Sequence, residues 1–127
     1  MQHKIYAFIS DGGVQEGISA EVGRLAGNLG LNNLIMFYDA NNIQLSTECG
    51  AVMNEDTGMK YRAWGWNVLE IDGNNPDAIR EALVAANKEE SRPTLIIGRT
   101  IMAKGALQAD GSSSVSYTHL TLPTKRI

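Results

Sequence analysis

The sequence predicts an α/β fold in which helices flank a parallel sheet. Short apolar segments rich in β-branched and aromatic residues alternate along the chain with longer segments of helical periodicity. The connections between the strand-like segments have the length of a helix, which favours parallel strands joined by right-handed crossovers. The chain has 127 residues, 43% of them hydrophobic, so we expect at most one domain.

The first expected unit is a strand, a helix and a second strand. Ile5 to Ile9 is short, apolar and β-rich, which indicates a buried strand, and a Ser-Asp-Gly-Gly cluster ends it. Residues 17–30 then change to helical spacing. The apolar stripe of this helix consists of Ile18, Val22, Leu25, Ala26 and Leu29. Leu34 to Ala40 is expected to form a second buried strand, which ends at Asn41 and Asn42.

The polar segment from Gln44 to Asn54 is expected to be irregular. After it, NEDTGMKYRAWG indicates a short helix with Asn54 as its cap and with Glu55 and Asp56 in its first turn. A side-chain oxygen at a helix start accepts a bond from a free N–H group, and acidic residues there interact favourably with the helix dipole.

Two more strands enclose the clearest helix in the chain. WNVLEID, Trp66 to Asp72, is the third expected strand, and TLIIGRT, Thr94 to Thr100, is the fourth. Between them, Asn75 can cap a helix, and Pro76 suits its first position. The apolar stripe of this helix consists of Ile79, Ala82, Leu83 and Ala86. In a parallel sheet of this kind, ligands bind beyond the carboxyl ends of the strands.

Composition and charge argue against several classes of protein. The formal net charge of −3 and the pI of about 5.3 leave no basic surface for nucleic acid. No segment reaches the roughly 18 apolar residues of a membrane-spanning helix, so no membrane partner is expected. Cys49 is the only cysteine, which rules out an internal disulfide and fits a cytoplasmic protein.

Two strand ends form the candidate site. Asp11 and Gly12 follow the first strand, and Asn41 follows the second strand, 30 residues after Asp11. If the two strands are adjacent and parallel, these residues meet at one edge of the sheet. Glycine lets backbone N–H groups approach a phosphate closely, whereas a carboxylate repels phosphate unless a cation lies between them. Carboxylate and amide oxygens suit Mg²⁺, which commonly joins carboxylates to phosphates.

Each of these motifs taken alone has an ordinary explanation. Asp-Gly-Gly and Asn-Asn are common turn sequences. Glu16 and Glu21 are of the kind that lie in solvent near a helix start. The matched strand ends and their spacing favour the joint interpretation, a site for Mg²⁺ and a diphosphate.

One long stretch resembles the diphosphate-binding segment of the transketolase family. This stretch is SDGGVQEGISAEVGRLAGNLGLNNLIMFYDANNIQLS, and the similarity continues through YRAWGWNVLEIDGNN, RPTLIIGRTIMAKGA and ADGSS. The thiamine diphosphate motif of the family is Gly-Asp-Gly, followed after one β-α-β unit by a turn that contains Asn. The resemblance covers residues 4–113 and implies a partial thiamine diphosphate-binding fold.

The resemblance implies a role for five positions. Asp11 and Asn41 would be ligands of Mg²⁺ or Ca²⁺, and Ile43 would supply a main-chain carbonyl to the same ion. Gly12 would offer its N–H to the diphosphate, and Leu45 would pack near the cofactor. For Ile43 and Leu45, an ordinary apolar role in a loop or core is an alternative.

Four further positions are placed by the same resemblance. Glu16 and Glu21 match acidic residues at the dimer interface of the family, where they help to link the two active sites through hydrogen bonds. Ser10 replaces the first glycine of the motif. Because serine has a side chain where glycine allows close backbone approach, this change affects the geometry of the turn. Ala103 replaces a glycine further along the chain, and we expect this to be the milder change.

The resemblance also implies what the whole enzyme does. A transketolase is a homodimer that uses thiamine diphosphate to transfer a two-carbon ketol unit from a ketose phosphate to an aldose phosphate. Its cofactor lies between the diphosphate domain of one subunit and the pyrimidine domain of the other. Residues 1–111 are therefore interpreted as a partial diphosphate-binding domain from a longer protein, inactive without the rest.

The last segment, residues 112–127, continues neither the helical nor the strand pattern. Val115 to Thr124 resembles a translated sequencing adapter, so we expect a disordered tail of non-native origin, with a genuine disordered terminus as the alternative. His119 lies in this tail and is given no catalytic role, and His3 is expected to be exposed.

Two other interpretations are compatible with part of the pattern. Another thiamine diphosphate enzyme, such as deoxyxylulose-phosphate synthase or a 2-oxo-acid dehydrogenase subunit, would share the paired Asp and Asn. A non-catalytic, receiver-like module would use Asp11 only to coordinate Mg²⁺. GRTIMAKGA and YRAWGWNV favour transketolase over the first, and the coupled spacing argues against the second.

Overall fold

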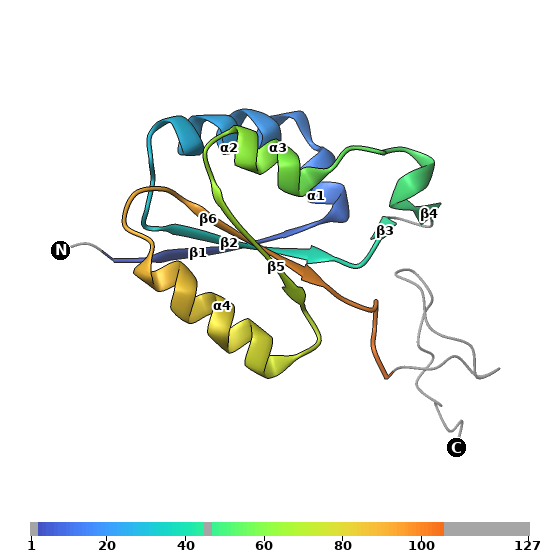
Figure 1. The fold of residues 1–127 in the computed structure, drawn as a ribbon. Coiled ribbons are helices and arrows are strands. Elements are labelled where there is room, and N and C mark those ends of the chain that lie inside the picture. The colour runs from blue at the N-terminus through green and yellow to red at the C-terminus, as the bar shows by residue number, and fades with distance from the viewer. Residues whose placement is uncertain (1–2, 45–46, 106–127) are drawn as a thin grey trace, which may run out of the picture.

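The computed structural model describes residues 3–44 and 47–105, and its core is a four-stranded parallel sheet (Figure 1). The strands are β1 (Ile5–Ser10), β2 (Leu34–Ala40), β5 (Asn67–Asp72) and β6 (Thr94–Arg99). They lie in the order β1-β2-β6-β5, and all pairings between them are parallel. The predicted α/β fold is confirmed, and the four strands fall where the sequence patterns place them.

Helices lie on both faces of this sheet (Figure 1). One face carries α1 (Asp11–Gln15), α2 (Gly17–Asn28) and α3 (Thr57–Ala63), and the other carries α4 (Pro76–Lys88). The segment between β2 and α3 contains a small hairpin and a 3-10 turn: β3 (Ile43–Gln44), β4 (Thr47–Glu48) and η1 (Cys49–Ala51). In the described part of the chain, no helix has the length and apolar character that crossing a membrane requires.

The core forms on both faces, and β6 is at its centre. Thr94 to Gly98 are all buried, because β6 lies between β2 and β5 and is covered from both sides. On the α2–α3 face, the buried cluster consists of Val14, Ala26, Tyr38, Ala40, Tyr61, Trp66, Leu95 and Ile97. On the α4 face, it consists of Ile35, Ala82, Ala86 and Ile96.

Side-chain caps mark the starts of the last two helices. Asn75 caps α4 and Pro76 takes its first position, as predicted. For α3 the predicted cap, Asn54, is wrong. Asp56 caps this helix, since its Oδ1 accepts a 2.8 Å hydrogen bond from the N–H of Met59. The helix begins later than the acidic pattern indicates, and the cap is the residue whose carboxylate reaches the N–H three positions on.

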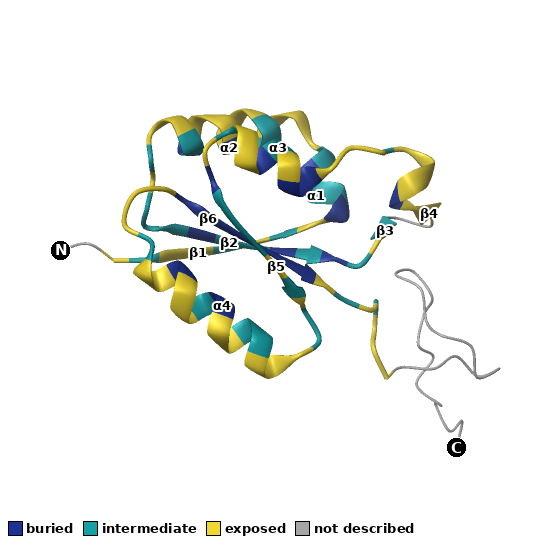
Figure 2. Cartoon of the chain, in the orientation of Figure 1, coloured by how far each residue is buried: buried dark blue, intermediate teal, exposed yellow. Residues whose placement is uncertain are grey.

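Most of the predicted apolar stripe of α2 is exposed, and Ala26 is its one buried member (Figure 2). Its exposed members are Ile18, Val22, Leu25 and Leu29. The helix meets the core through Gly23 and Ala26, both buried. A Cβ added to Gly23 would lie 2.9 Å from a ring carbon of Trp64, and the indole of Trp66 donates a 2.8 Å hydrogen bond to the Gly23 carbonyl. Small residues are therefore required where the helix approaches these two rings.

The strand β1 is more exposed than its apolar sequence predicts. Tyr6 is 53% exposed and Phe8 is 83% exposed, although both belong to a segment expected to be buried. The strand lies at the edge of the sheet and pairs only with β2. The interpretation as a buried strand is thus wrong for β1, because burial depends on neighbours that its own sequence does not specify.

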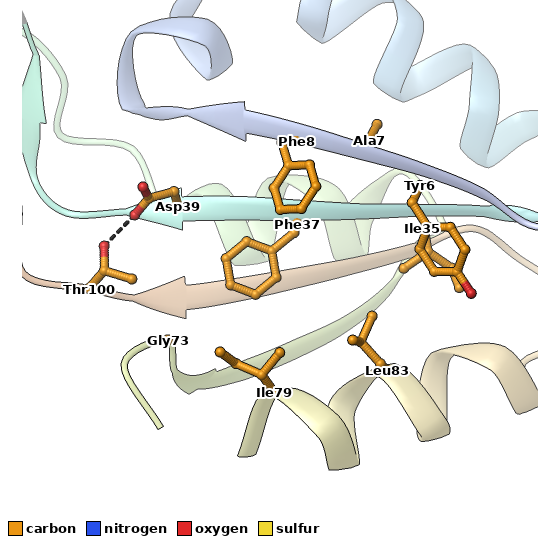
Figure 3. A pocket seen from close by; sticks show the side chains of 10 residues that line it. All are labelled: Tyr6, Ala7, Phe8, Ile35, Phe37, Asp39, Gly73, Ile79, Leu83 and Thr100. Atoms are coloured by element: carbon orange, nitrogen blue, oxygen red, sulfur yellow. Dashed lines mark hydrogen bonds between the residues drawn. The ribbon is translucent and has the colours of Figure 1, made fainter. Parts of the chain in front are cut away.

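An apolar groove lies on the α4 face, over β1 and β2 (Figure 3). Its volume is about 350 Å³, and its apolar walls include Tyr6, Phe8, Ile35, Phe37, Ile79 and Leu83. Among the described residues, Asp39 is the one charged residue in its lining, and the hydroxyl of Thr100 donates a hydrogen bond to it. The groove therefore offers mainly apolar contact.

Candidate functional site

Two strand ends meet at the carboxyl edge of the sheet, as predicted. In the register of β1 and β2, Ser10 lies opposite Asp39, so the chain leaves both strands at the same point. There the backbone N–H of Asn41 donates a 3.1 Å hydrogen bond to Oδ2 of Asp11. The parallel pairing thus brings Asp11 and Asn41 into direct contact.

Asp11 is a buried carboxylate that has no positively charged partner among the described residues. The residue is 2% exposed. Its oxygens accept hydrogen bonds from two neutral groups, the Tyr38 hydroxyl at 2.6 Å from Oδ1 and the Asn41 N–H at Oδ2. Within residues 3–44 and 47–105, no ion pair includes Asp11. Buried charges in proteins are normally paired with an opposite charge or bound to a metal, so we expect a cation to bind at Asp11.

Asn41 and Ile43 belong to a turn beside Asp11. The N–H of Ile43 donates a 2.9 Å hydrogen bond to Oδ1 of Asn41, and Asn42 has a φ of +66°. Asn tolerates this left-handed conformation better than most residues do. The Asn41 amide oxygen is thereby held in place, and its second lone pair can still bind a cation.

The backbone at Gly12 borders open space. A Cβ built on this residue would meet no atom within 4 Å. A ligand can therefore approach the main chain next to Asp11 closely, which a packed neighbour would prevent. This agrees with the predicted role of Gly12, which itself stays a prediction.

A polar cavity of about 310 Å³ adjoins Asp11. Its lining includes two more carboxylates, Glu55 and Asp56, and one cationic side chain, Arg99. Such a lining repels an anionic ligand unless a cation accompanies it, because like charges at short range raise the free energy of binding. A diphosphate beside this lining would need a cation between it and the carboxylates, and the lining includes neither Gly12 nor Asn41.

The donor set suits a hard divalent cation. Asp11 and Asn41 supply a carboxylate and an amide oxygen, which are ligands of Mg²⁺ and Ca²⁺. Nowhere in the described ranges do three His, Cys, Asp or Glu side chains gather as a metal cluster. A zinc site would need such a group of nitrogen or sulfur ligands, so the residues present fit magnesium-type chemistry better.

Tyr38 and Cys49 also line this cavity, and neither was predicted to belong to the site. Burial raises the pKa of the Tyr38 hydroxyl, and the hydrogen bond to Asp11 raises it further. Burial and the nearby Asp11 carboxylate raise the pKa of the Cys49 thiol to about 11. Tyr38 is placed here by the strand register, which pairs it with Ile9, two residues before Asp11. Cys49 carries no such signal, because it comes from a 3-10 turn.

We expect the folded chain to lose stability as the pH rises from about 9 to about 11. The ordinary pKa of the thiol is 9.0, and in the folded chain the pKa of Cys49 is about 11. In this range the unfolded chain binds fewer protons than the folded one, so the free energy of unfolding falls with pH. Urea denaturation at several pH values measures this.

Cys49→Ala is the matched variant for this experiment, because it removes the thiol and leaves Tyr38 in place. It should lose less stability over the same pH range. An identical pH dependence in the two chains would show that Cys49 does not contribute.

Neither of the two predicted glutamates is among the groups that bond to Asp11 in the described part of the chain. Glu16 is exposed, and its side chain makes no capping bond at the start of α2. Glu21 is exposed and forms a 3.1 Å ion pair with Arg24. Their role at an interface between subunits stays a prediction. Leu45 lies outside the described residues, so its contact with a cofactor stays a prediction too.

Comparison with known proteins shows the family of this chain. Residues 1–122 match the family described as transketolase, thiamine diphosphate binding domain. The chain belongs to the transketolase family. The alternatives of a receiver-like module and of another class of thiamine diphosphate enzyme are therefore set aside.

Transketolases of several bacteria are similar to this chain over most of its length. Transketolase 1 of Pasteurella multocida is 44% identical over 107 residues, which is 84% of this chain and 16% of that protein. The plasmid-encoded transketolase of Cupriavidus necator is 40% identical over 124 residues, which is 97% of this chain and 18% of that protein. The chain thus spans less than a fifth of the length of these curated relatives.

Solved structures of transketolases share the fold. The crystal structure of transketolase from Campylobacter jejuni superposes with a TM-score of 0.80 at 44% identity, covering 84% of this chain and 17% of that one. The transketolase from Leishmania mexicana superposes with a TM-score of 0.74 at 32% identity, covering 77% of this chain and 15% of that one.

The two departures from the transketolase motif differ in their effect on the backbone. Ser10, in place of the first motif glycine, has a φ of −114° and a ψ of 175°, an extended conformation that any residue adopts. Ala103 has a φ of +48°, in the left-handed region that favours glycine and costs other residues about 1–2 kcal/mol. The expectation that Ala103 is the milder change is therefore wrong with respect to backbone strain.

Proposed function

We propose that this chain is the diphosphate- and magnesium-binding part of a transketolase. In the whole enzyme, the reaction would be the transfer of a two-carbon ketol unit from a ketose phosphate to an aldose phosphate. The observation that carries the proposal is the buried, unpaired carboxylate of Asp11 in contact with Asn41. Burial of a lone charge costs free energy, and a divalent cation between Asp11 and a diphosphate would offset that cost.

Each residue of the site would have a distinct task. Asp11 and Asn41 would bind Mg²⁺ through side-chain oxygens, Ile43 would add its main-chain carbonyl, and Gly12 would donate its N–H to the diphosphate. Leu45 would pack near the cofactor. When bound, thiamine diphosphate supplies the nucleophilic carbon that the ketol transfer needs, and the protein contributes binding and orientation.

The exposed face of α2 supports a homodimer in the whole enzyme. Four large apolar side chains lie on this face, namely Ile18, Val22, Leu25 and Leu29. Contiguous exposed apolar side chains often mark an interface with another protein. Glu16 and Glu21 come from the same part of the chain, so a partner seated there could meet them. We propose that these two glutamates take part in a proton network between the two active sites.

The remaining parts of the proposal concern the limits of the chain. Residues 1–111 are proposed to form only part of a cofactor-binding domain, and the chain is proposed to be inactive as a transketolase alone. The tail of residues 112–127 lies outside the described residues, and its non-native origin stays a proposal. A cytoplasmic location also stays a proposal, and it rests on cysteine usage.

NMR spectroscopy of the 127-residue chain with Mn²⁺ tests the proposed site. Mn²⁺ takes oxygen ligands as Mg²⁺ does, and it broadens the signals of nearby nuclei. We expect selective broadening of the Gly12 and Asn41 amide signals, and added Mg²⁺ should reverse it. Broadening centred on Glu55 and Asp56, or no broadening at all, would contradict the proposal.

The same spectra can test the diphosphate. Thiamine diphosphate should shift the Gly12 amide signal only when Mg²⁺ is present, since the acidic lining otherwise repels it. Thiamine, which lacks phosphates, serves as the control and should cause no shift. A shift by thiamine alone, or a shift by thiamine diphosphate in EDTA, would count against a metal-bridged diphosphate.

A further inference from the structure

The outer side of β1 is open for pairing with another strand. Among residues 3–44 and 47–105, β1 pairs only with β2, so one side of its backbone has no strand partner. An edge strand presents its unpaired N–H and C=O groups as a template for a further strand. We call this open side of the strand the β1 edge.

The β1 edge lacks the features by which proteins usually block such pairing. Exposed edges are commonly protected by charged side chains, proline or a bulge. The strand IYAFIS contains no charge and no proline, and it pairs with β2 in unbroken register. Lys4, just before the strand, donates hydrogen bonds to the carbonyls of Asn32 and Glu89, at 2.9 and 3.3 Å. Its charge is thus engaged within the chain, and the strand itself carries no group that opposes pairing.

Apolar hollows lie on both faces of the sheet beside this edge. On the α4 face, Tyr6 and Phe8 form part of the wall of the 350 Å³ groove (Figure 3). On the α2–α3 face, the lining of a hollow of about 210 Å³ includes Ile9 of β1 and Ile18 and Val22 of α2. Because successive side chains of a strand point to opposite faces, a strand added at the β1 edge would need apolar side chains on both faces.

The strand β1 of a second copy has this pattern. Tyr6 and Phe8 lie on its α4 face, and apolar residues lie on the other. These are Ile5, Ala7 and Ile9. A two-fold axis perpendicular to the sheet would set the two β1 strands antiparallel and keep the α4 faces of both copies on one side. The same residues would then meet on each side of the axis, so the β1 edge is complementary to itself.

We propose that two copies of this chain associate through their β1 edges, as an antiparallel pair that joins two four-stranded sheets into one. The main-chain groups of the β1 edge supply the hydrogen bonds, and Tyr6 and Phe8 supply apolar contact on the α4 face. This association involves no residue of the proposed metal site and goes beyond the proposed function. It also differs from the homodimer proposed for the whole enzyme, which rests on the exposed face of α2.

The exposed area of β1 indicates a weak dimer. Phe8 is 83% exposed and Tyr6 is 53% exposed. An enclosed aromatic side chain buries about 150–250 Å², so these two would contribute on the order of 500 Å² over both copies. Interfaces that bury less than about 1,200 Å² in total are typical of transient complexes. The dimer should therefore exchange with monomers as the concentration changes.

Analytical ultracentrifugation of the 127-residue chain tests the association. The mass should rise from 13.8 kDa towards twice that value between about 10 µM and about 1 mM, as mass action requires. Phe8→Lys places a charge on the β1 edge and should keep the chain monomeric over the whole range. Leu29→Lys is the matched control, because Leu29 is also exposed, at 59%, but belongs to the stripe of α2. It should associate like the unsubstituted chain.

Amide hydrogen exchange locates the contact in the unsubstituted chain. Exchange of the β1 amides at the open side should slow at least about threefold between the low and the high concentration. Exchange in β5, which is the other edge strand of the sheet, should not change and serves as the internal control. This measurement also tests the proposal if Phe8→Lys does not fold.

Several outcomes would overturn the proposal. One is a chain that is monomeric at every concentration, and another is growth beyond two copies, because a two-fold pair is closed. Association that persists in Phe8→Lys, or that is lost in Leu29→Lys, would place the contact elsewhere. Slow exchange of all β1 amides at every concentration would mean that a segment of the same chain covers the edge. The binding of Mn²⁺ tests the proposed function separately from all of these.

Discussion

Asp11→Asn should remove most of the affinity of the chain for Mg²⁺ while keeping the fold. The change takes away the negative charge at the proposed site and keeps the shape of the side chain. The new amide can accept the N–H bond of Asn41 and donate to the oxygen of Tyr38, so both groups keep a hydrogen bond to this side chain, while the Tyr38 O–H loses its acceptor. We expect the dissociation constant for Mg²⁺ to rise at least about 100-fold, or about 2.8 kcal/mol, in titrations followed by NMR.

The stability of the metal-free chain gives a second measurement on the same variant. A buried carboxylate without a partner opposes folding, so Asp11→Asn should not lower the free energy of unfolding in EDTA. Mg²⁺ should stabilise the unsubstituted chain, because it binds the folded state, and it should have little effect on Asp11→Asn. Asn41→Ala should weaken binding less, since it removes a neutral ligand. Unchanged Mg²⁺ affinity in both variants would refute the metal assignment.

Gly27→Ala should destabilise the chain by about 3 kcal/mol or more, which is at or beyond the upper end for overpacked cores. A Cβ built on Gly27 would lie 1.9 Å from the carbonyl oxygen and 2.9 Å from the carbonyl carbon of Trp64. Both atoms belong to the backbone, so no side-chain rotation can relieve the clash. The helix α2 would have to move away from the core cluster that contains Trp66. Urea denaturation of the purified chain measures the effect.

Gly17→Ala is the control for this substitution, because it makes the same change in the same helix. A Cβ on Gly17 would meet no atom within 4 Å. Alanine favours helix over glycine, so this variant should be unchanged or more stable by up to about 1 kcal/mol. A loss of less than about 1 kcal/mol in Gly27→Ala would mean that α2 can shift freely, contrary to the close packing inferred from the glycine.

Much of the candidate site could be predicted from the sequence, because the residues that follow each predicted strand lie at the same edge of a parallel sheet. Asp11 and Asn41 each follow a short β-rich segment, and parallel pairing of those segments is enough to bring them together. Tyr38 could not be assigned in the same way, since its hydroxyl reaches Asp11 only after β1 and β2 adopt one particular register. A tyrosine in an apolar strand otherwise indicates only core packing.

The burial of individual side chains was harder to predict than the positions of the helices and strands. Phe8 and the stripe of α2 have the apolar pattern of core residues, yet they are exposed in this chain. Periodicity shows that a segment has an apolar face, but it does not say which neighbour covers that face. The inward face of α2 is instead decided by Gly23 and Gly27, where the backbone comes close to Trp64 and Trp66.

The order of strands and helices along the chain, the parallel sheet and the pairing of Asp11 with Asn41 could all be predicted from the sequence alone. These follow from local propensity and from the rule that connected parallel strands end on one edge. The three-dimensional fold was needed to show which faces are buried, that Asp11 has no cationic partner among the described residues, and that the Tyr38 hydroxyl bonds to it. Those facts depend on contacts between residues distant in sequence, whose geometry is set by packing and not by any local pattern.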